Sequence, residues 1–316
     1  MCNHKVVLSL LIIIGTCFHA IGQQGQEYIF FSNVDDLNQI DYLTKNAIDS
    51  KKITWVSMGD NTPDVLLELK EKYSKSEHIY LLGDLHQQLL DNEDLLPKKI
   101  KLSVSCPEPY IEHISDNSII IMINSAWFLD RELRFLSLEQ SCEYFNEIQL
   151  IESLESIFED YPDHQKIILA HHGIHAFSEI AGKGLGLNNL IPIYGQLYNG
   201  FRKHIGQKGD LAQVNYRQYI KLIKKFIETQ KNVVFVSGHD HLNFIDVENK
   251  LMHVNVNSGR QINRFTKSEK VDYVNQKPSI LRITNSNDEL TIAFESRNET
   301  YKNCLLYTSP SPRDRG

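Results

Sequence analysis

The sequence predicts an α/β protein, because short aliphatic runs alternate with helical segments along most of its length. The first such runs cover residues 28–32, 53–58 and 78–82. Pro63 suits the first turn of a helix after the second run, and apolar residues follow it at helical spacing. Polar residues of the types that bind metals come directly after several of these runs. We therefore predict a sheet whose strand ends carry a functional site.

The later elements continue the same alternation. Residues 118–123 form a continuous apolar run, as expected of a strand that is buried on both faces. A capping-box sequence at Ser137 predicts a helix that runs through Phe158 and closes near Pro162. Further strands are predicted at residues 166–170, 232–237, 251–256, 280–284 and 290–294, and a further helix at residues 215–230.

The N-terminal residues have the form of a targeting segment. Residues 1–22 are predicted to be a signal peptide, because Lys5 precedes an apolar run at residues 6–17 and a small-x-small cleavage pattern follows. The alternatives are a buried N-terminal strand and a lipoprotein anchor on Cys17. The signal peptide predicts an exported protein that is periplasmic, bound at the cell surface or secreted.

The C-terminal residues differ from the rest of the chain. Residues 304–316 resemble the translation of a sequencing adapter, and a natural Ser/Pro-rich tail is the alternative. We therefore predict one large domain over residues 23–303 and expect the natural chain to continue beyond it. Its two cysteines are Cys106 and Cys142, and an oxidising compartment would allow them to pair without requiring it.

Composition limits the classes of function. Hydrophobic residues make up 41% of the chain and charged residues 23%, which are ordinary values for a globular protein. The formal net charge is −7. Non-specific binding of nucleic acid needs a basic surface, so no nucleic-acid partner is expected.

The candidate site consists of metal-ligating side chains that follow predicted strands. In open α/β sheets, ligands bind outside the carboxyl ends of the strands, so these side chains are expected to converge. Carboxylates and neutral imidazoles are suitable ligands for Zn, Fe and Mn. The candidate metal ligands are Asn33, Asp60, Asp84, His171, His239 and His241.

Two adjacent histidines follow the predicted strand at residues 166–170. Because neighbouring side chains point in different directions, we expect at most one of His171 and His172 to bind a metal directly. The other would support that ligand, contact the substrate or be structural.

At these positions the chain resembles the calcineurin-like metallophosphoesterases, including the bacterial branch that is similar to purple acid phosphatases. The sequence Gly238-His239-Asp240-His241 matches the last motif of that family, and His171-His172-Gly173 is similar to its His-His-Pro. The resemblance covers residues 27–260. It implies an α/β/β/α sandwich of four layers, in which two mixed β-sheets are flanked by helices.

The resemblance also implies an activity, which is hydrolysis of a small phosphate mono- or diester by a metal-bound hydroxide. One or two ions of Fe, Zn or Mn would lie between the strand ends. Asp60 and His171 are implied catalytic residues, and His172 and His175 are further candidates for contact with the substrate. Around Asp60 as the bridging carboxylate, the ligands would be Asp84, His171 and His239 for one ion, and Asn33 and His241 for a more weakly held second ion.

Three departures from the family pattern bear on activity. Asn33 stands where the family has a metal-binding aspartate, and Leu85 stands where it has the histidine that contacts phosphate or protonates the leaving group. A later histidine of the pattern has no counterpart near residues 178–182. Loss of general acid help costs roughly 10²- to 10⁴-fold in rate. His86 or His175 are the residues that could substitute.

These departures define an alternative function. The chain would then be a catalytically degenerate protein that keeps the scaffold and binds an unknown ligand or partner. Bacterial members of the family can carry a membrane-associated C-terminal region, so the resemblance also implies possible membrane association through residues beyond this sequence.

Overall fold

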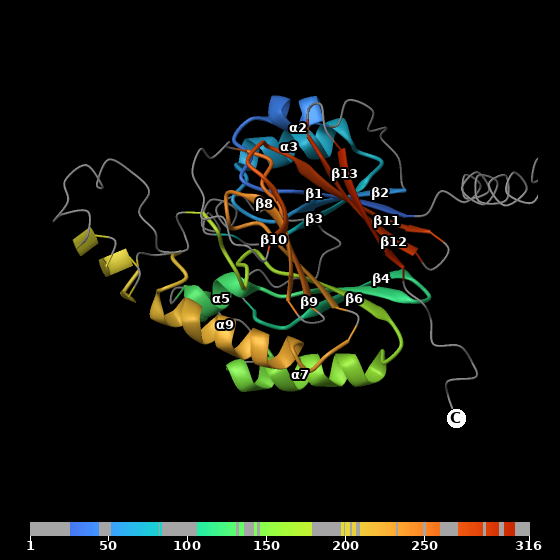
Figure 1. Ribbon diagram of the computed structural model, residues 1–316. Coiled ribbons are helices and arrows are strands. Elements are labelled where there is room, and N and C mark those ends of the chain that lie inside the picture. Colours follow the sequence, from blue (N-terminus) through green and yellow to red (C-terminus); the bar gives the residue numbers. More distant parts are fainter. Residues whose placement is uncertain are drawn as a thin grey trace, which may run out of the picture.

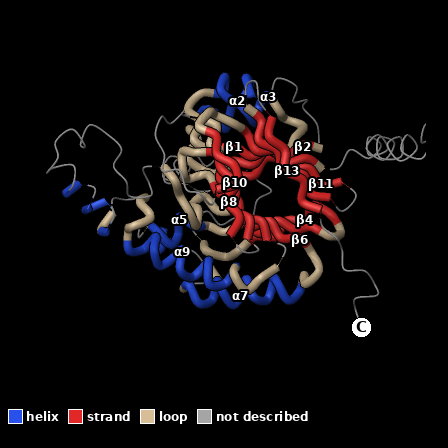
Figure 2. The backbone as a smooth tube through the Cα atoms, viewed as in Figure 1, coloured by secondary structure: helices blue, strands red, loops and turns tan. Residues whose placement is uncertain are grey.

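Two β-sheets packed face to face, with helices on their outer sides, make up the protein in a computed structural model (Figures 1 and 2). The helices α2 and α3 lie along one outer side, and α7 and α9 lie along the other. The structure describes residues 26–43, 52–81, 83, 106–130, 133–135, 142–143, 146–178, 197–198, 200–202, 204–206, 209–231, 233–248, 251–259, 271–286, 289–296 and 300–306.

The first sheet has the strand order β13-β12-β11-β1-β2-β3. The strands β1, β2 and β3 pair in parallel, whereas β11 joins β1 in antiparallel orientation and β12 and β13 continue antiparallel. The bounds are β1 Glu27–Phe31, β2 Ile53–Ser57, β3 Glu77–Tyr80, β11 Ile280–Ser286, β12 Glu289–Glu295 and β13 Thr300–Leu306.

The second sheet has the order β10-β8-β9-β7-β6-β5-β4. Its central strands β5, β6, β7 and β9 are parallel, and β4, β8 and β10 are antiparallel to their neighbours. The bounds are β4 Tyr110–Ser115, β5 Ser118–Met122, β6 Gln165–Leu169, β7 Val233–Ser237, β8 Asn243–Glu248, β9 Leu251–Asn255 and β10 Val271–Asn275.

The cores explain why the central strands are apolar on both faces. Along β1, Phe30 joins the core between the two sheets, whereas its neighbours Ile29 and Phe31 join the core under the outer helices. This follows from the alternation of side chains along a strand. The outer helices are α2 Leu37–Leu43 and α3 Pro63–Lys72 on the first sheet, and α7 Glu147–Asp160 and α9 Val214–Ile227 on the second, where the short helix α5 Ser125–Leu129 also packs.

This architecture confirms the predicted sandwich and places most predicted strands within one or two residues. The helix predicted from Ser137 is an exception. The described helix α7 begins at Glu147, because the side chain of Asn146 caps it by accepting bonds from the amides of Ile148 and Gln149. Residues 142–143 are not helical. Ser137 itself lies outside the described residues, as do residues 1–25.

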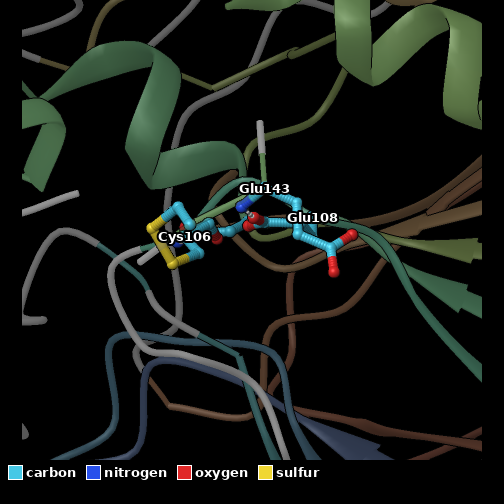
Figure 3. The surroundings of a disulfide bond; sticks show 5 residues. Cys106, Glu108 and Glu143 are labelled. Atoms are coloured by element: carbon cyan, nitrogen blue, oxygen red, sulfur yellow. Dashed lines mark hydrogen bonds between the residues drawn. A yellow bond between two sulfur atoms is a disulfide. The ribbon is translucent and has the colours of Figure 1, made fainter. Parts of the chain in front are cut away.

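A disulfide joins Cys106 and Cys142, whose pairing the sequence left open (Figure 3). The bond ties the segment before β4 to the segment before α7, and the Glu108 side chain accepts a hydrogen bond from the amide of Glu143 beside it. Strand β13 reaches Leu306, three residues beyond the predicted domain end at residue 303. Among the residues that the structure describes, no helix has the length and apolar character needed to cross a bilayer.

Candidate functional site

The candidate site lies where strands of both sheets end. Asn33 follows β1, and Asp60 follows β2, each in the left-handed backbone region, with φ of 60° and 56°. This conformation is uncommon for residues other than glycine, and it is concentrated at functional turns. His171 follows β6 and His239 follows β7 in the other sheet, so the two sheets contribute to one place.

Asp60, His171 and His239 meet at this place, and we call them the acceptor cluster. The Nε2 atom of His171 lies 3.3 Å from Oδ2 of Asp60 and 3.2 Å from Nδ1 of His239. His171 is fully buried, His239 is 6% exposed, and the side chain of Asp60 is 15% exposed. The ends of β2 and β7 thus bring Asp60 and His239 to His171.

Backbone carbonyls determine which ring nitrogens carry hydrogen in the two histidines. Nδ1 of His171 lies 2.6 Å from the carbonyl oxygen of Met58, and Nε2 of His239 lies 2.8 Å from that of Gly209. A carbonyl oxygen only accepts, so each of these nitrogens donates. When the imidazoles are neutral, the other nitrogen of each ring therefore carries a lone pair, and these two nitrogens lie 3.2 Å apart beside the Asp60 carboxylate. Three acceptors that face one another favour a cation between them.

Two glycines provide the space for this cluster. Gly59 has φ of 99°, and a Cβ atom there would overlap Nδ1 of His171. A Cβ atom at Gly83, just after β3, would overlap Oδ1 of Asp60. The backbone therefore approaches the acceptor cluster more closely than any residue with a side chain would allow.

His172 also approaches the cluster, although adjacent residues were expected to diverge. The ring planes of His171 and His172 are 87° apart, yet the ring centroid of His172 lies 4.7 Å from that of His239. Ligand atoms of His171, His172 and His239 lie within 4.8 Å of one another, all buried. Nδ1 of His172 lies 3.0 Å from Oγ of Ser125, which fixes the ring.

Asn33 takes part in a different arrangement, which we call the amide network, with Asn257 and the carbonyl of Gly238. Nδ2 of Asn33 donates to the Gly238 oxygen at 2.9 Å and to Oδ1 of Asn257 at 3.4 Å. Nδ2 of Asn257 in turn donates to the carbonyl of His241 at 3.0 Å. Each donor in this network meets an acceptor, so Oδ1 is the one atom of the Asn33 side chain that could bind a metal.

The last motif places its two other polar residues differently. Burial lowers the pKa of His241 below its ordinary value, and the charge of His239 lowers it further. Asp60 and His171 also interact electrostatically with His241, so His241 lies near the cluster. The Asp240 carboxylate accepts from the amides of Phe177 and Ser178, at 2.6 and 3.3 Å. Burial raises the pKa of Asp240. Asp240 therefore anchors the loop that follows His171.

His175, a candidate for substrate contact, pairs with β8. Its Nδ1 contacts the carboxylate of Asp246, and its Nε2 lies 3.4 Å from that of Glu248. Behind it, His253 is fully buried on β9 and donates from Nε2 to Oγ of Ser237 at 2.8 Å. Burial, then the charges of His175 and Lys224, hold the pKa of His253 well below its ordinary range.

Some predicted residues fall outside the described part of the chain, and some contributors were not predicted. Asp84, Leu85, His86 and residues 179–196 lie outside the described residues. Asn257 was missed, although its position after β9 follows the same strand-end rule. The carbonyls of Met58 and Gly209 were missed because a backbone acceptor leaves no signal in the sequence.

Comparison with known proteins identifies the fold. No protein-family model matches the chain, and no curated protein matches it by sequence. Among solved structures, GAP50, described as the anchor in the inner membrane complex of Plasmodium, has a TM-score of 0.55 at 14% identity, with 92% of this chain and 91% of that one covered.

Two phosphatase-type structures match over similar lengths. A dimetal phosphatase from Danio rerio has a TM-score of 0.52 at 11% identity, covering 90% of this chain and 100% of its own. PhoD has a TM-score of 0.51 at 8% identity, covering 90% and 69%. At these identities the likeness concerns the fold alone. The two mixed sheets flanked by helices, together with these neighbours, show that the chain has the αββα sandwich of the metallophosphoesterases.

Proposed function

We propose that this protein is an exported, metal-dependent phosphoesterase that hydrolyses a small phosphate mono- or diester. The observation that carries the proposal is the acceptor cluster, where Nε2 of His171 lies 3.2 Å from Nδ1 of His239 and 3.3 Å from Oδ2 of Asp60, beside the buried His172 ring. A cation held between these atoms would be attracted to all of them, in a site where water screens little. Two nitrogens and one oxygen suit Zn, Fe or Mn better than Mg or Ca.

The residues of the site have distinct parts in such a reaction. When bound, the ion would supply Lewis-acid chemistry, which neutralises the negative charge that develops on the phosphoryl oxygens. The carbonyls behind His171 and His239 would hold the N–H of each ring and leave the other ring nitrogen directed at the ion. Asp60 is the most exposed member of the cluster, so the phosphoester would approach from its side, where His241 also lies.

The amide network favours a second candidate function. Because the Asn33 amide is bonded to Gly238 and Asn257, that side of the site is satisfied without a second ion. A protein with one metal and no histidine at position 85 could use the scaffold to bind a phosphorylated ligand without turning it over. The fold is compatible with this, because GAP50, named an anchor, shares it.

The test is a metal count combined with turnover. The full chain is loaded with Zn, Mn or Fe, the bound metal is measured by elemental analysis, and aryl phosphate mono- and diesters are assayed. Wild type should retain at least one ion and turn over, and His239→Ala should lose the ion and more than about 100-fold in rate. Exposed His113 provides the control His113→Ala, which should match wild type.

The outcomes separate the two candidates. One retained ion without turnover favours the binding function. Retention of the ion by His239→Ala contradicts both. Export is tested separately, because N-terminal sequencing of the exported protein should begin at Gln23. The disulfide between Cys106 and Cys142 supports export, since such bonds persist mainly in oxidising compartments.

A further inference from the structure

The carbonyl of Gly209 belongs to a built structure at the start of α9. The amide of Gly209, at φ of 86°, donates to the side chain of Gln213 at 3.1 Å, and the amide of Gln213 donates back to the carbonyl of Asp210 at 3.0 Å. Gln213 is the N-terminal cap residue of α9. The turn that presents the Gly209 oxygen to His239 is therefore fixed to the helix on both sides.

A buried ion pair holds the same turn from the other direction. Nε of Arg202 donates to Oδ2 of Asp210 at 2.9 Å, and its Nη2 donates to Oδ1, so the pair is bidentate. The side chains are 11% and 3% exposed. A bidentate pair of this kind fixes orientation as well as distance, because the guanidinium and carboxylate planes must align.

The same helix also reaches the other histidine loop. The hydroxyl of Tyr219 donates to the carbonyl of His172 at 3.1 Å, and that of Tyr216 donates to the carbonyl of Gly173 at 2.9 Å. The end of α9 that begins at Val214 thus contacts the loops after β6 and β7, which carry the imidazoles of the acceptor cluster.

We propose that the Arg202–Asp210 ion pair is a positioning device for His239, because it holds the Gly209 carbonyl that fixes the Nε2–H tautomer and turns Nδ1 toward His171. This inference rests on the proposed function for its consequence, which is the affinity for metal. The part of the inference that concerns the tautomer of His239 does not depend on a bound metal. Partners that orient a ligating histidine commonly change metal affinity about 10- to 100-fold when they are removed.

The experiment records nitrogen-proton correlation spectra of the metal-free full chain with labelled histidine, followed by titration with Zn²⁺. Wild type should show His239 protonated at Nε2 and His171 at Nδ1. In Arg202→Met, the His239 signal should shift toward mixed tautomers while that of His171 stays, and zinc affinity should fall about 10- to 100-fold.

A second variant covers the case in which Arg202→Met does not fold, because it leaves the Asp210 charge buried. Arg202→Lys keeps a positive charge opposite Asp210 but cannot form the bidentate contact, so it should fold and produce the same tautomer change. The matched control is Arg282→Met, which breaks the bidentate pair of Arg282 with Glu295 on β11 and β12 and should leave both readouts unchanged.

Two results would overturn the inference. One is a wild-type His239 tautomer with wild-type zinc affinity in a folded Arg202 variant. The other is an equal change in Arg282→Met, which would indicate general loosening of the fold. If wild type binds no zinc, the proposed function fails, and the tautomer spectra of the metal-free variants still decide whether the ion pair positions His239.

Discussion

The two sides of the site differ in how their polar atoms are balanced. In the acceptor cluster, lone pairs of His171 and His239 face each other and the Asp60 carboxylate. In the amide network, which includes the carbonyl of Gly238 next to His239 in the chain, each contact joins a donor on Asn33 or Asn257 to an acceptor. An excess of acceptors calls for a cation, whereas a balanced network needs none. The comparison teaches that one side of the site keeps atoms suited to a cation, whereas the other side joins its polar atoms to one another.

Two glycine substitutions test this comparison with the largest expected effects. Gly59→Ala forces a Cβ atom onto His171 at φ of 99°, and Gly259→Ala forces one onto the carbonyl oxygen of Asn33. Each should cost about 1–3 kcal/mol of unfolding free energy. Only Gly59→Ala should also weaken zinc binding, by at least about 10-fold, because it displaces a ligand. Denaturant unfolding and zinc titration measure both, and equal loss of zinc in the two variants would refute the division.

Substitutions at Asn33 sharpen the comparison at the other side. Asn33→Asp places a carboxylate against the Gly238 carbonyl, so it should destabilise the metal-free protein by about 1–3 kcal/mol. Asn33→Ala removes the bond without adding charge and should cost less. Added Zn²⁺ or Mn²⁺ should reverse the order, because the new carboxylate then becomes a ligand. Thermal unfolding with and without metal checks this, and an order that metal leaves unchanged would contradict it.

A further buried imidazole tests whether burial alone makes a metal ligand. His253 is as buried as His171, but it donates to Ser237, whose hydroxyl donates to Asn255, so it has no cluster of facing acceptors. His253→Gln should leave zinc affinity unchanged. A loss of zinc affinity comparable to that of Gly59→Ala would show that the arrangement of acceptors is not what matters.

The last prediction concerns the unfolding free energy, which should depend on pH through the titration of His253. The pKa of His253 is lowered in the folded state, so below about pH 6.5 the unfolded chain takes up the proton first. The unfolding free energy should fall with decreasing pH from there, by up to about 1.4 kcal/mol per pH unit for this one group. His253→Gln should reduce that slope between about pH 6.5 and 5 in denaturant titrations. An unchanged slope would contradict the assignment.

Much of the fold could be predicted because its central strands are continuous aliphatic runs, as at residues 118–123. The strands that were missed have less distinctive patterns. Strand β4 is only partly buried along its length, and β8 begins with a buried asparagine and contains the buried Asp246. The start of α7 was misplaced because the capping-box pattern at Ser137 competed with the true cap at Asn146.

The candidate site was predictable only to the level of side-chain type. The strand-end rule placed Asp60, His171 and His239 together, because parallel strands of each sheet end at one edge. It could not assign tautomers, which depend on the carbonyls of Met58 and Gly209. Nor could it show that the amide of Asn33 is directed at Gly238, because that contact joins residues 205 positions apart.

The most direct measurement of the central claim is the anomalous diffraction of crystals grown with Zn²⁺, recorded on both sides of the zinc absorption edge. The account predicts one strong peak about 2.0–2.2 Å from Oδ2 of Asp60, Nε2 of His171 and Nδ1 of His239. No such peak is expected beside Nδ2 of Asn33. A site that stays empty at millimolar zinc, with His171 and His239 sharing a proton between their facing nitrogens, would contradict the account.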